Sequence, residues 1–174
     1  EIAQCLVGSE MCIRDRPEDD FSMLLHYKLI CENRSHLTEY FGVSKELSNR
    51  IYRHLNEFKS FSSFAELLKT KNITRTAINR ALLHILLDVN SEDVQAVTKR
   101  GCVDYIRVLG FRKEAAPLLK EFSDIPEIPL ITNLSDAPVL CDMDIRAEQI
   151  YQIAASKKYG VPYINEYQRK MLVI

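Results

Sequence analysis

The segment Thr70–Asp88 (TKNITRTAINRALLHILLD) constrains the fold of this chain more than any other segment. Its apolar residues follow the i, i+3, i+4, i+7, i+8 spacing of one helix face: Ile78, Ala81, Leu82, Ile85 and Leu86. Thr74 stands just before this stripe, and its hydroxyl can accept a hydrogen bond from an amide of the first helical turn. The spacing therefore predicts a helix over 75–88 with one buried face.

The opposite face of this predicted helix is cationic. Arg75 and Arg80 lie largely off the apolar stripe, and Lys69 and Lys71 stand just upstream. A rigid helix with cations on its solvated side suits a phosphate backbone. The other interpretation is a core helix with ordinary solvated charges.

Composition limits the classes of protein that the chain can belong to. Its 174 residues allow one domain or two small ones, and 47% apolar content is enough for a core. No window approaches the roughly 18 unbroken apolar residues of a membrane helix. Because the formal net charge is −1, a nucleic-acid site would have to be a local patch.

The chain has five cysteines, an odd number, and no two of them form a CxxC pair. This pattern argues against a disulfide framework and against a zinc site. It favours a protein of the reducing cytoplasm.

The first sixteen residues look foreign to the rest of the chain. Leu6–Arg16 (LVGSEMCIRDR) resembles the translated read of a transposase adapter used to prepare sequencing libraries. The competing interpretation is a native strand over Cys5–Val7 and a turn at Gly8–Ser9. We expect residues 1–16 to have no structural role, the native sequence to begin near Pro17, and its N-terminal portion to be missing.

The first half of the remaining chain reads as helical. Helices are expected over residues 19–32, 44–58, 64–69 and 75–88, and another from Ser91. Asp19 or Asp20 and Ser44 are candidate N-caps, and Ser63 with Glu66 makes a possible capping box.

After Gly101 the sequence changes character. Val103–Leu109 and Ile128–Thr132 have the β-branched content of strands, and Lys113–Phe122 between them reads as a helix. A strand, a helix and a strand in about thirty residues indicate a β-α-β unit with parallel strands. The predicted class is α+β, mostly helical, with this small unit in the C-terminal half.

A further helix is expected over Asp144–Tyr159, ended by Gly160, and a closing strand over Met171–Ile174. We expect a helical region over 17–100 and a small α/β region over 101–174, packed together as one C-terminal domain.

Few residue patterns suggest chemistry. The sequence has no glycine-rich phosphate loop and no HxxH pair. Cys102 with His84 would make a thiol dyad, but nothing orients a third partner, and a buried structural thiol is the better interpretation. Asp142 and Asp144 resemble a carboxylate pair, yet they stand where helix capping needs them.

Five segments carry a family resemblance: their order and spacing agree with one family, and their motifs are specific in combination, although each alone would be weak. They are DDFSMLLHYKL (19–29), VSKELSNRI (43–51), SFAELLKTKNITRTAINRALLHILLDV (63–89), YIRVLGF (105–111) and IPLITNL (128–134). Together they resemble the C-terminal part of the tRNA(Met) cytidine acetate ligase family, which is nucleotidyltransferase-like. At one place the chain departs from the family: Asn72 and Ile73 stand where members commonly have a basic-aromatic pair.

The resemblance implies a bacterial, cytoplasmic enzyme that uses ATP to activate acetate as acetyl-adenylate. The acetyl group then passes to the wobble cytidine of elongator tRNA(Met). In that family the nucleotide site lies in an N-terminal nucleotidyltransferase fold with a HIGH-like histidine motif, which this sequence lacks. We therefore assign no catalytic, cofactor-binding or metal residue to this chain, and expect ATP and acetate to bind in the missing N-terminal domain.

Two functions remain for this portion: it helps to hold tRNA, or it is purely a structural platform for the missing domain. A free-standing thiol or metal enzyme is a weaker third option. The RNA-binding candidates are Arg50, Arg53, Lys69, Lys71, Arg75 and Arg80. They form one patch if their two helices pack as an antiparallel pair. The competing expectation is that Glu46, Glu57 and Glu66 neutralise these cations on a solvated surface.

Overall fold

The computed structural model describes residues 17–101, 103, 105–123, 128–134, 142–168 and 171–174. This part of the chain is mostly helical, with a few short parallel strands in its second half, which confirms the predicted α+β class. It divides into two compact units, one ending at Ser91 and one beginning at Glu92. The expected packing of both regions into one domain stays a prediction, as does the foreign origin of residues 1–16, which lie outside the described residues.

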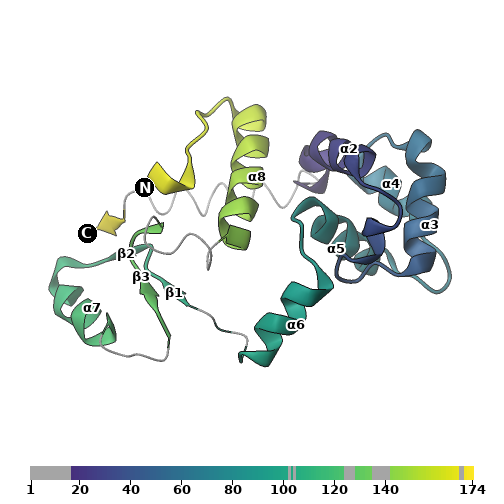
Figure 1. Cartoon of the computed structure of the whole chain (residues 1–174). Helices are drawn as coiled ribbons and strands as arrows, with labels where there is room; N and C mark the ends of the chain where they lie inside the picture. The colour runs from purple at the N-terminus through teal and green to yellow at the C-terminus, as the bar shows by residue number, and fades with distance from the viewer. Residues whose placement is uncertain (1–16, 102, 104, 124–127, 135–141, 169–170) are drawn as a thin grey trace. The chain divides into compact units, whose positions relative to one another are not determined.

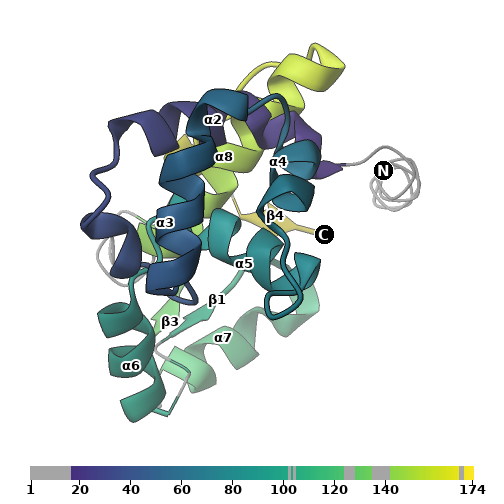
Figure 2. The ribbon, with the colours of Figure 1, turned by 90° about the vertical axis from the view of Figure 1, so that its right-hand side faces the viewer.

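The first unit is a bundle of short helices (Figures 1 and 2). In chain order they are η1 (Pro17–Phe21), α2 (Ser22–Cys31), η2 (His36–Thr38), α3 (Lys45–His54), η3 (Leu55–Glu57), α4 (Phe61–Leu68) and α5 (Arg75–Leu86). Helix α5 packs on both α2 and α4, and α3 packs on α4. The helix predicted from the apolar stripe is therefore the element around which the unit is assembled.

Side-chain caps fix where three of these helices begin. The Thr74 hydroxyl accepts a hydrogen bond from the Ala77 amide at 3.3 Å, and the Ser44 hydroxyl accepts one from the Leu47 amide at 3.1 Å. Both predicted caps are confirmed. The capping box predicted at Ser63 is wrong by one turn, because Ser60 is the N-cap of α4 and Ser63 is its reciprocal partner.

The cap predicted for the first long helix is also wrong. Helix α2 begins after Phe21, which makes no side-chain capping bond. The Asp19 carboxylate instead accepts hydrogen bonds from the amide and the hydroxyl of Ser62, at 2.7 and 2.8 Å. Asp19 thus serves the first turn of α4, which is distant in the sequence and where a negative charge is favourable.

The core of the first unit is continuous across its helices. The five stripe residues of α5 are all buried, as predicted. Phe61 and Phe64 of α4 are fully buried against them, together with Leu25 of α2 and Ile51 of α3. Burial of this much apolar surface is the main stabilising contribution to such a bundle.

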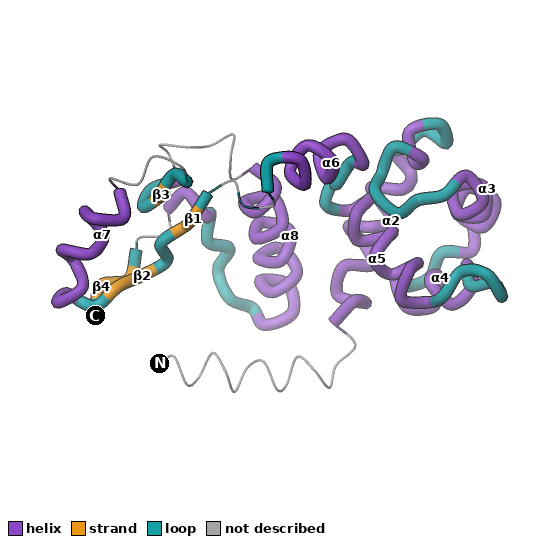
Figure 3. The backbone as a smooth tube through the Cα atoms, turned by 90° about the horizontal axis from the view of Figure 1, so that it is seen from below, coloured by secondary structure: helices purple, strands orange, loops and turns teal. Residues whose placement is uncertain are grey.

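The second unit contains the predicted β-α-β arrangement (Figure 3). After α6 (Ser91–Lys99), strand β1 (Ile106–Arg107) pairs in parallel with β3 (Leu130–Ile131), and α7 (Ala116–Ser123) lies between them in the sequence. The amides of Ile106 and Val108 donate to the carbonyls of Pro129 and Ile131, at 2.9 and 3.0 Å. The strands are shorter than predicted, because only these two residue pairs are in register.

A second parallel pair joins β2 (Gly110–Phe111) to β4 (Leu172–Val173), which confirms the closing strand. A side chain at Gly110 would place its Cβ 2.7 Å from the Leu172 carbonyl oxygen, so this close pairing requires glycine. Helix α8 (Asp142–Tyr159) ends at Gly160, which has φ +65° as the predicted C-cap requires. A small cluster of Ile131, Leu134 and Ile145, with Tyr105 against it, is the core of this unit.

Candidate nucleic-acid interface

Arg50, the first of the six candidate cations, has a structural role. From α3 its guanidinium donates to the carbonyl oxygens of Leu67 and Leu68 at 3.0 Å each, and to that of Lys69 at 3.5 Å. These carbonyls close α4 and have no partner within the helix. A cation is favourable at this negative end of the helix. Arg50 therefore holds the end of α4 against α3.

Two more of the candidates form ion pairs. Lys69 lies 3.0 Å from one oxygen of Glu66, and Arg75 lies 4.0 Å from the other oxygen and 3.5 Å from Glu18. Lys69, Glu66 and Arg75 are exposed and Glu18 is partly exposed, so each pair contributes little to stability. The expectation that Glu66 pairs with these cations is confirmed. Glu57 contacts His54 instead, at 2.7 Å.

The remaining candidates are Arg53, Lys71 and Arg80. All three are exposed, and none makes a hydrogen bond or an ion pair with another residue in the described part of the chain. An exposed cation that has no ion pair loses no internal partner when it binds a phosphate. These three residues are therefore the better-placed members of the set.

The helices carrying these cations are arranged differently from the pair assumed from the sequence. Helix α3 packs chiefly on α4, and α4 packs on α5, so α4 connects them in the chain of contacts. The end of α4 nevertheless brings Arg50, Lys69 and Arg75 together, through the Lys69 carbonyl and Glu66. Lys71 lies in the connection that follows, whereas Arg80 is more than one turn further along α5.

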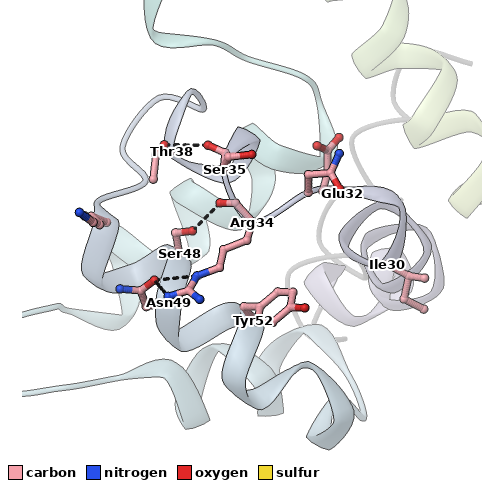
Figure 4. A pocket seen from close by; sticks show the side chains of 10 residues that line it. Ile30, Glu32, Arg34, Ser35, Thr38, Ser48, Asn49 and Tyr52 are labelled. Atoms are coloured by element: carbon pink, nitrogen blue, oxygen red, sulfur yellow. Dashed lines mark hydrogen bonds between the residues drawn. The ribbon is translucent and has the colours of Figure 1, made fainter.

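A pocket that the sequence did not predict lies beside α3 (Figure 4). Its volume is about 1030 Å³. The segment after α2 and one side of α3 supply most of its lining, with Ile30, Glu32, Asn33, Arg34, Ser35, Thr38, Lys45, Ser48, Asn49 and Tyr52. The signal in the sequence was the pair Asn49 and Tyr52, three residues apart on the solvated side of a predicted helix.

A titratable cluster ties α2 to the residue that follows α5. The Lys28 ammonium lies 2.6 Å from Glu32 and 2.7 Å from Asp88, and the Tyr40 hydroxyl donates to both carboxylates, at 2.7 and 3.0 Å. Asp88 has φ +56°, a left-handed conformation that an aspartate adopts more readily than most residues. The two carboxylates and their donors satisfy one another, which indicates a structural cluster.

The pKa values in this cluster move as ion pairing requires. Burial alone would lower the pKa of Lys28, but its hydrogen bonds to Asp88 and Glu32 raise that pKa above its usual range. Burial would raise the pKa of Glu32, but the bonds from Lys28 and Tyr40 hold it below its ordinary value. Burial and the bond to Glu32 raise the pKa of Tyr40. All three groups are held in the form that the cluster needs at neutral pH.

Of the other constellations considered from the sequence, the thiol dyad stays untested, and the two carboxylates lie in the first turn of α8. Cys102, half of the thiol dyad, lies outside the described residues, and Nδ1 of His84 donates to the Phe41 carbonyl at 2.7 Å. Asp142 pairs with Arg146 in its own helix. No group of three metal-ligating side chains occurs in the described part, and no helix there is long and apolar enough to cross a membrane.

Comparison with known proteins gives the family context of this geometry. The model of a family described as HIGH Nucleotidyl Transferase matches residues 4–162. The chain is 34% identical to the tRNA(Met) cytidine acetate ligase of Bacillus subtilis over 139 residues, which are 79% of this chain and 33% of that protein. It is 33% identical to the ligase of Listeria monocytogenes serotype 4a over 136 residues, 78% of this chain and 33% of that protein. The chain thus spans about a third of the length of these relatives.

Solved structures share the fold. The crystal structure of Thermotoga maritima TmcAL in its apo form superposes with a TM-score of 0.75 at 21% sequence identity, covering 90% of this chain and 40% of that one. A second crystal structure of the same protein, bound with alpha-thio ATP, matches equally well, with 41% of that chain covered.

Proposed function

The chain belongs to the HIGH nucleotidyl transferase family, and from this premise we propose that it is the tRNA-holding portion of an ATP-dependent ligase that acetylates the wobble cytidine of tRNA(Met). Its relatives of known name are tRNA(Met) cytidine acetate ligases, and it corresponds to a third of their length. The observation that carries the RNA-binding role is that Arg53, Lys71 and Arg80 are exposed cations without a partner among the described residues.

The binding mechanism is phosphate neutralisation. Each cation that meets a phosphate releases a condensed counterion, which gives affinity that does not depend on base sequence and falls as salt rises. Arg53 and Lys71 would contribute most directly, since neither gives up an internal ion pair. Lys69 and Arg75 would exchange Glu66 for phosphate, and Arg50 would act by keeping the end of α4 in place.

The chemistry belongs to the rest of the protein in this proposal. ATP and acetate would bind, and acetyl-adenylate would form, in a nucleotidyltransferase domain outside this chain. The solved relative bound with alpha-thio ATP supports nucleotide binding by the family as a whole. We expect the 174-residue chain by itself to have no acetate-dependent exchange of pyrophosphate into ATP.

The alternative function is a structural platform that packs on the catalytic domain. The ion pairs of Lys69 and Arg75 and the helix-closing role of Arg50 favour it, because half of the six candidates already have internal partners.

A salt series with a charge-reversed variant tests the proposal against this alternative. The variant Arg53→Glu/Lys71→Glu removes two exposed cations, and the matched control Lys99→Glu/Lys113→Glu makes the same charge change at exposed sites of the second unit. We expect the slope of log Kobs against log salt for a tRNA(Met) transcript to fall by about 1.5–2 in the first variant only. Equal slopes in both variants and the unmodified chain would favour the platform.

A further inference from the structure

We propose that the pocket beside α3 binds an unpaired RNA base, which stacks on Tyr52 while Arg34 and Asn49 contact its edge or its phosphate. This inference rests on the proposed RNA-binding function and deepens it. The cations alone would bind any phosphate backbone. The pocket would add recognition of one feature of the RNA, a single-stranded nucleotide whose base is out of the helical stack.

The pocket is an open depression that is large enough for a nucleotide. Its volume of about 1030 Å³ lies at the upper limit of the roughly 300–1000 Å³ of small-ligand pockets. The lining combines one aromatic ring with hydroxyl, amide and cationic groups. Such a mixture suits a ligand with a flat apolar face and a polar edge.

The groups that would meet the base are held in place before a ligand arrives (Figure 4). Nε and Nη2 of Arg34 donate to Oδ1 of Asn49, at 3.0 and 2.6 Å. The Ser48 hydroxyl donates to the Arg34 carbonyl at 3.1 Å, which fixes the backbone at that residue. The Arg34 guanidinium carbon lies 5.7 Å from the centre of the Tyr52 ring. Orientation before binding lowers the entropy cost of recognition.

Tyr52 is the aromatic side chain that lines the pocket, and its ring is not part of the buried core. Its ring is 57% exposed on α3 and lines the pocket, whereas the more exposed Tyr27 ring on α2 does not. Tyr40 shows the contrast: it is 5% exposed, and its hydroxyl donates to Glu32 and Asp88. A solvent-exposed tyrosine ring beside an arginine offers a surface on which a base can stack. Such stacking supplies much of the affinity of proteins for single-stranded RNA.

The pocket lies next to one of the exposed candidate cations, Arg53 of α3. Lys45, Asn49 and Arg53 stand at i, i+4 and i+8 and therefore form one row along the helix, with Tyr52 beside it. A strand whose phosphates follow Lys45 and Arg53 would carry its base over Tyr52. The lining holds one carboxylate, Glu32, against two cations, Arg34 and Lys45, so its formal charge is positive and favours an anion.

The test compares two RNA probes of equal phosphate charge: a fluorescein-labelled twelve-residue oligouridylate and an abasic ribose-phosphate strand of the same length. Fluorescence anisotropy with the 174-residue chain gives both affinities. We expect the oligouridylate to bind about tenfold more tightly than the abasic strand, and Tyr52→Ala to remove this difference. Tyr52→Phe should keep it, because the ring stacks without its hydroxyl. Tyr27→Ala is the matched control, since Tyr27 is 70% exposed on α2 and outside the pocket.

Crosslinking locates the contact independently. An oligouridylate carrying one 4-thiouridine should crosslink, on irradiation, to a peptide that contains Tyr52 or Arg34. Equal affinity for both probes, with Tyr52→Ala unchanged, would overturn the stacking pocket and leave the phosphate-binding function standing. Absence of binding to either probe at low salt would overturn both, and would point to a protein surface as the occupant of the pocket.

Discussion

The two units of this chain differ in how completely each buries its apolar residues. In the first unit, four helices enclose a core in which Phe61, Phe64 and the whole α5 stripe are almost inaccessible to solvent. In the second, the described buried apolar side chains are Ile131, Leu134, Ile145 and Ala154, and many others are exposed, among them Phe122 and Tyr163. Helix pairs bury a face with local contacts, whereas two-residue strand pairs cover little surface. The first unit therefore has the material for independent stability, and the second requires further apolar contacts.

The largest expected effect tests this comparison by substituting one phenylalanine in each unit. Phe61→Ala in the first unit should lower the free energy of unfolding by about 3–5 kcal/mol, because it leaves a cavity in a closed core. Phe122→Ala in the second unit removes the same atoms, but its ring is 53% exposed. This substitution should change the free energy of unfolding by less than about 0.5 kcal/mol. Urea denaturation followed by circular dichroism measures both. Equal losses would show that the two cores are equivalent.

A smaller effect sharpens the role of local signals in the first unit. Thr74→Ala removes the hydroxyl that caps α5 and should cost about 1 kcal/mol. Thr76→Ala, at an exposed position in the first turn of the same helix, is the control and should stay within about 0.5 kcal/mol of the unmodified chain. Urea midpoints of the two variants separate capping from helix propensity. Identical midpoints would mean that packing alone sets where α5 begins.

The smallest expected effect is the pH dependence of the Lys28 cluster. The folded pKa of Glu32 lies below its unfolded value of about 4.5, so the unfolded chain binds the proton first as pH falls. The stabilisation is therefore full above that value and is lost on acidification through the folded pKa. Urea midpoints between pH 6 and pH 3 should fall less steeply in Glu32→Gln than in the unmodified chain. Glu46→Gln, at an exposed site of α3, should keep the original steepness; a match between the two variants would exclude Glu32 as the source.

The same cluster predicts an alkaline limit. The folded pKa of Lys28 lies above its unfolded value of about 10.5, so its contribution is complete below that pH and disappears as pH rises through the folded value. Lys28→Met should flatten the alkaline part of the urea-midpoint profile and leave the part near neutral pH with the same slope.

Elements set by local spacing could be predicted from the sequence. Helix α5, its Thr74 cap and the Gly160 stop follow from residues within one or two turns, and all were found. The capping box was placed one turn late because Ser63 and Glu66 match the usual pattern of a Ser or Thr followed three residues later by Glu or Gln, whereas the pair that forms is Ser60 with Ser63. Local rules thus identify an element more reliably than its first residue.

What depends on distant partners could not be predicted. The Asp19 carboxylate looks like a cap for its own helix, yet it binds Ser62, 43 positions away. Arg50 reads as a free surface cation until the end of α4 is placed against it. The pocket required the segment around Arg34 to approach Asn49, which no periodicity encodes. The sequence therefore predicts which residues belong to the candidate site, and the structure is needed to see which partners each of them contacts.

The contacts that close the first unit also bear on the order in which it folds. Lys28 and Asp88 are 60 positions apart, and the isolated bridge between Tyr40 and Asn90 joins the same two stretches of chain. Contacts across such long loops carry a larger closure entropy than the helical turns between them. The helices should consequently form before the Lys28–Asp88 and Tyr40–Asn90 contacts do. Weakening these contacts should accelerate unfolding far more than it slows folding. The lifetime of the native unit is then set at its last-formed contacts, and not by its most buried helix.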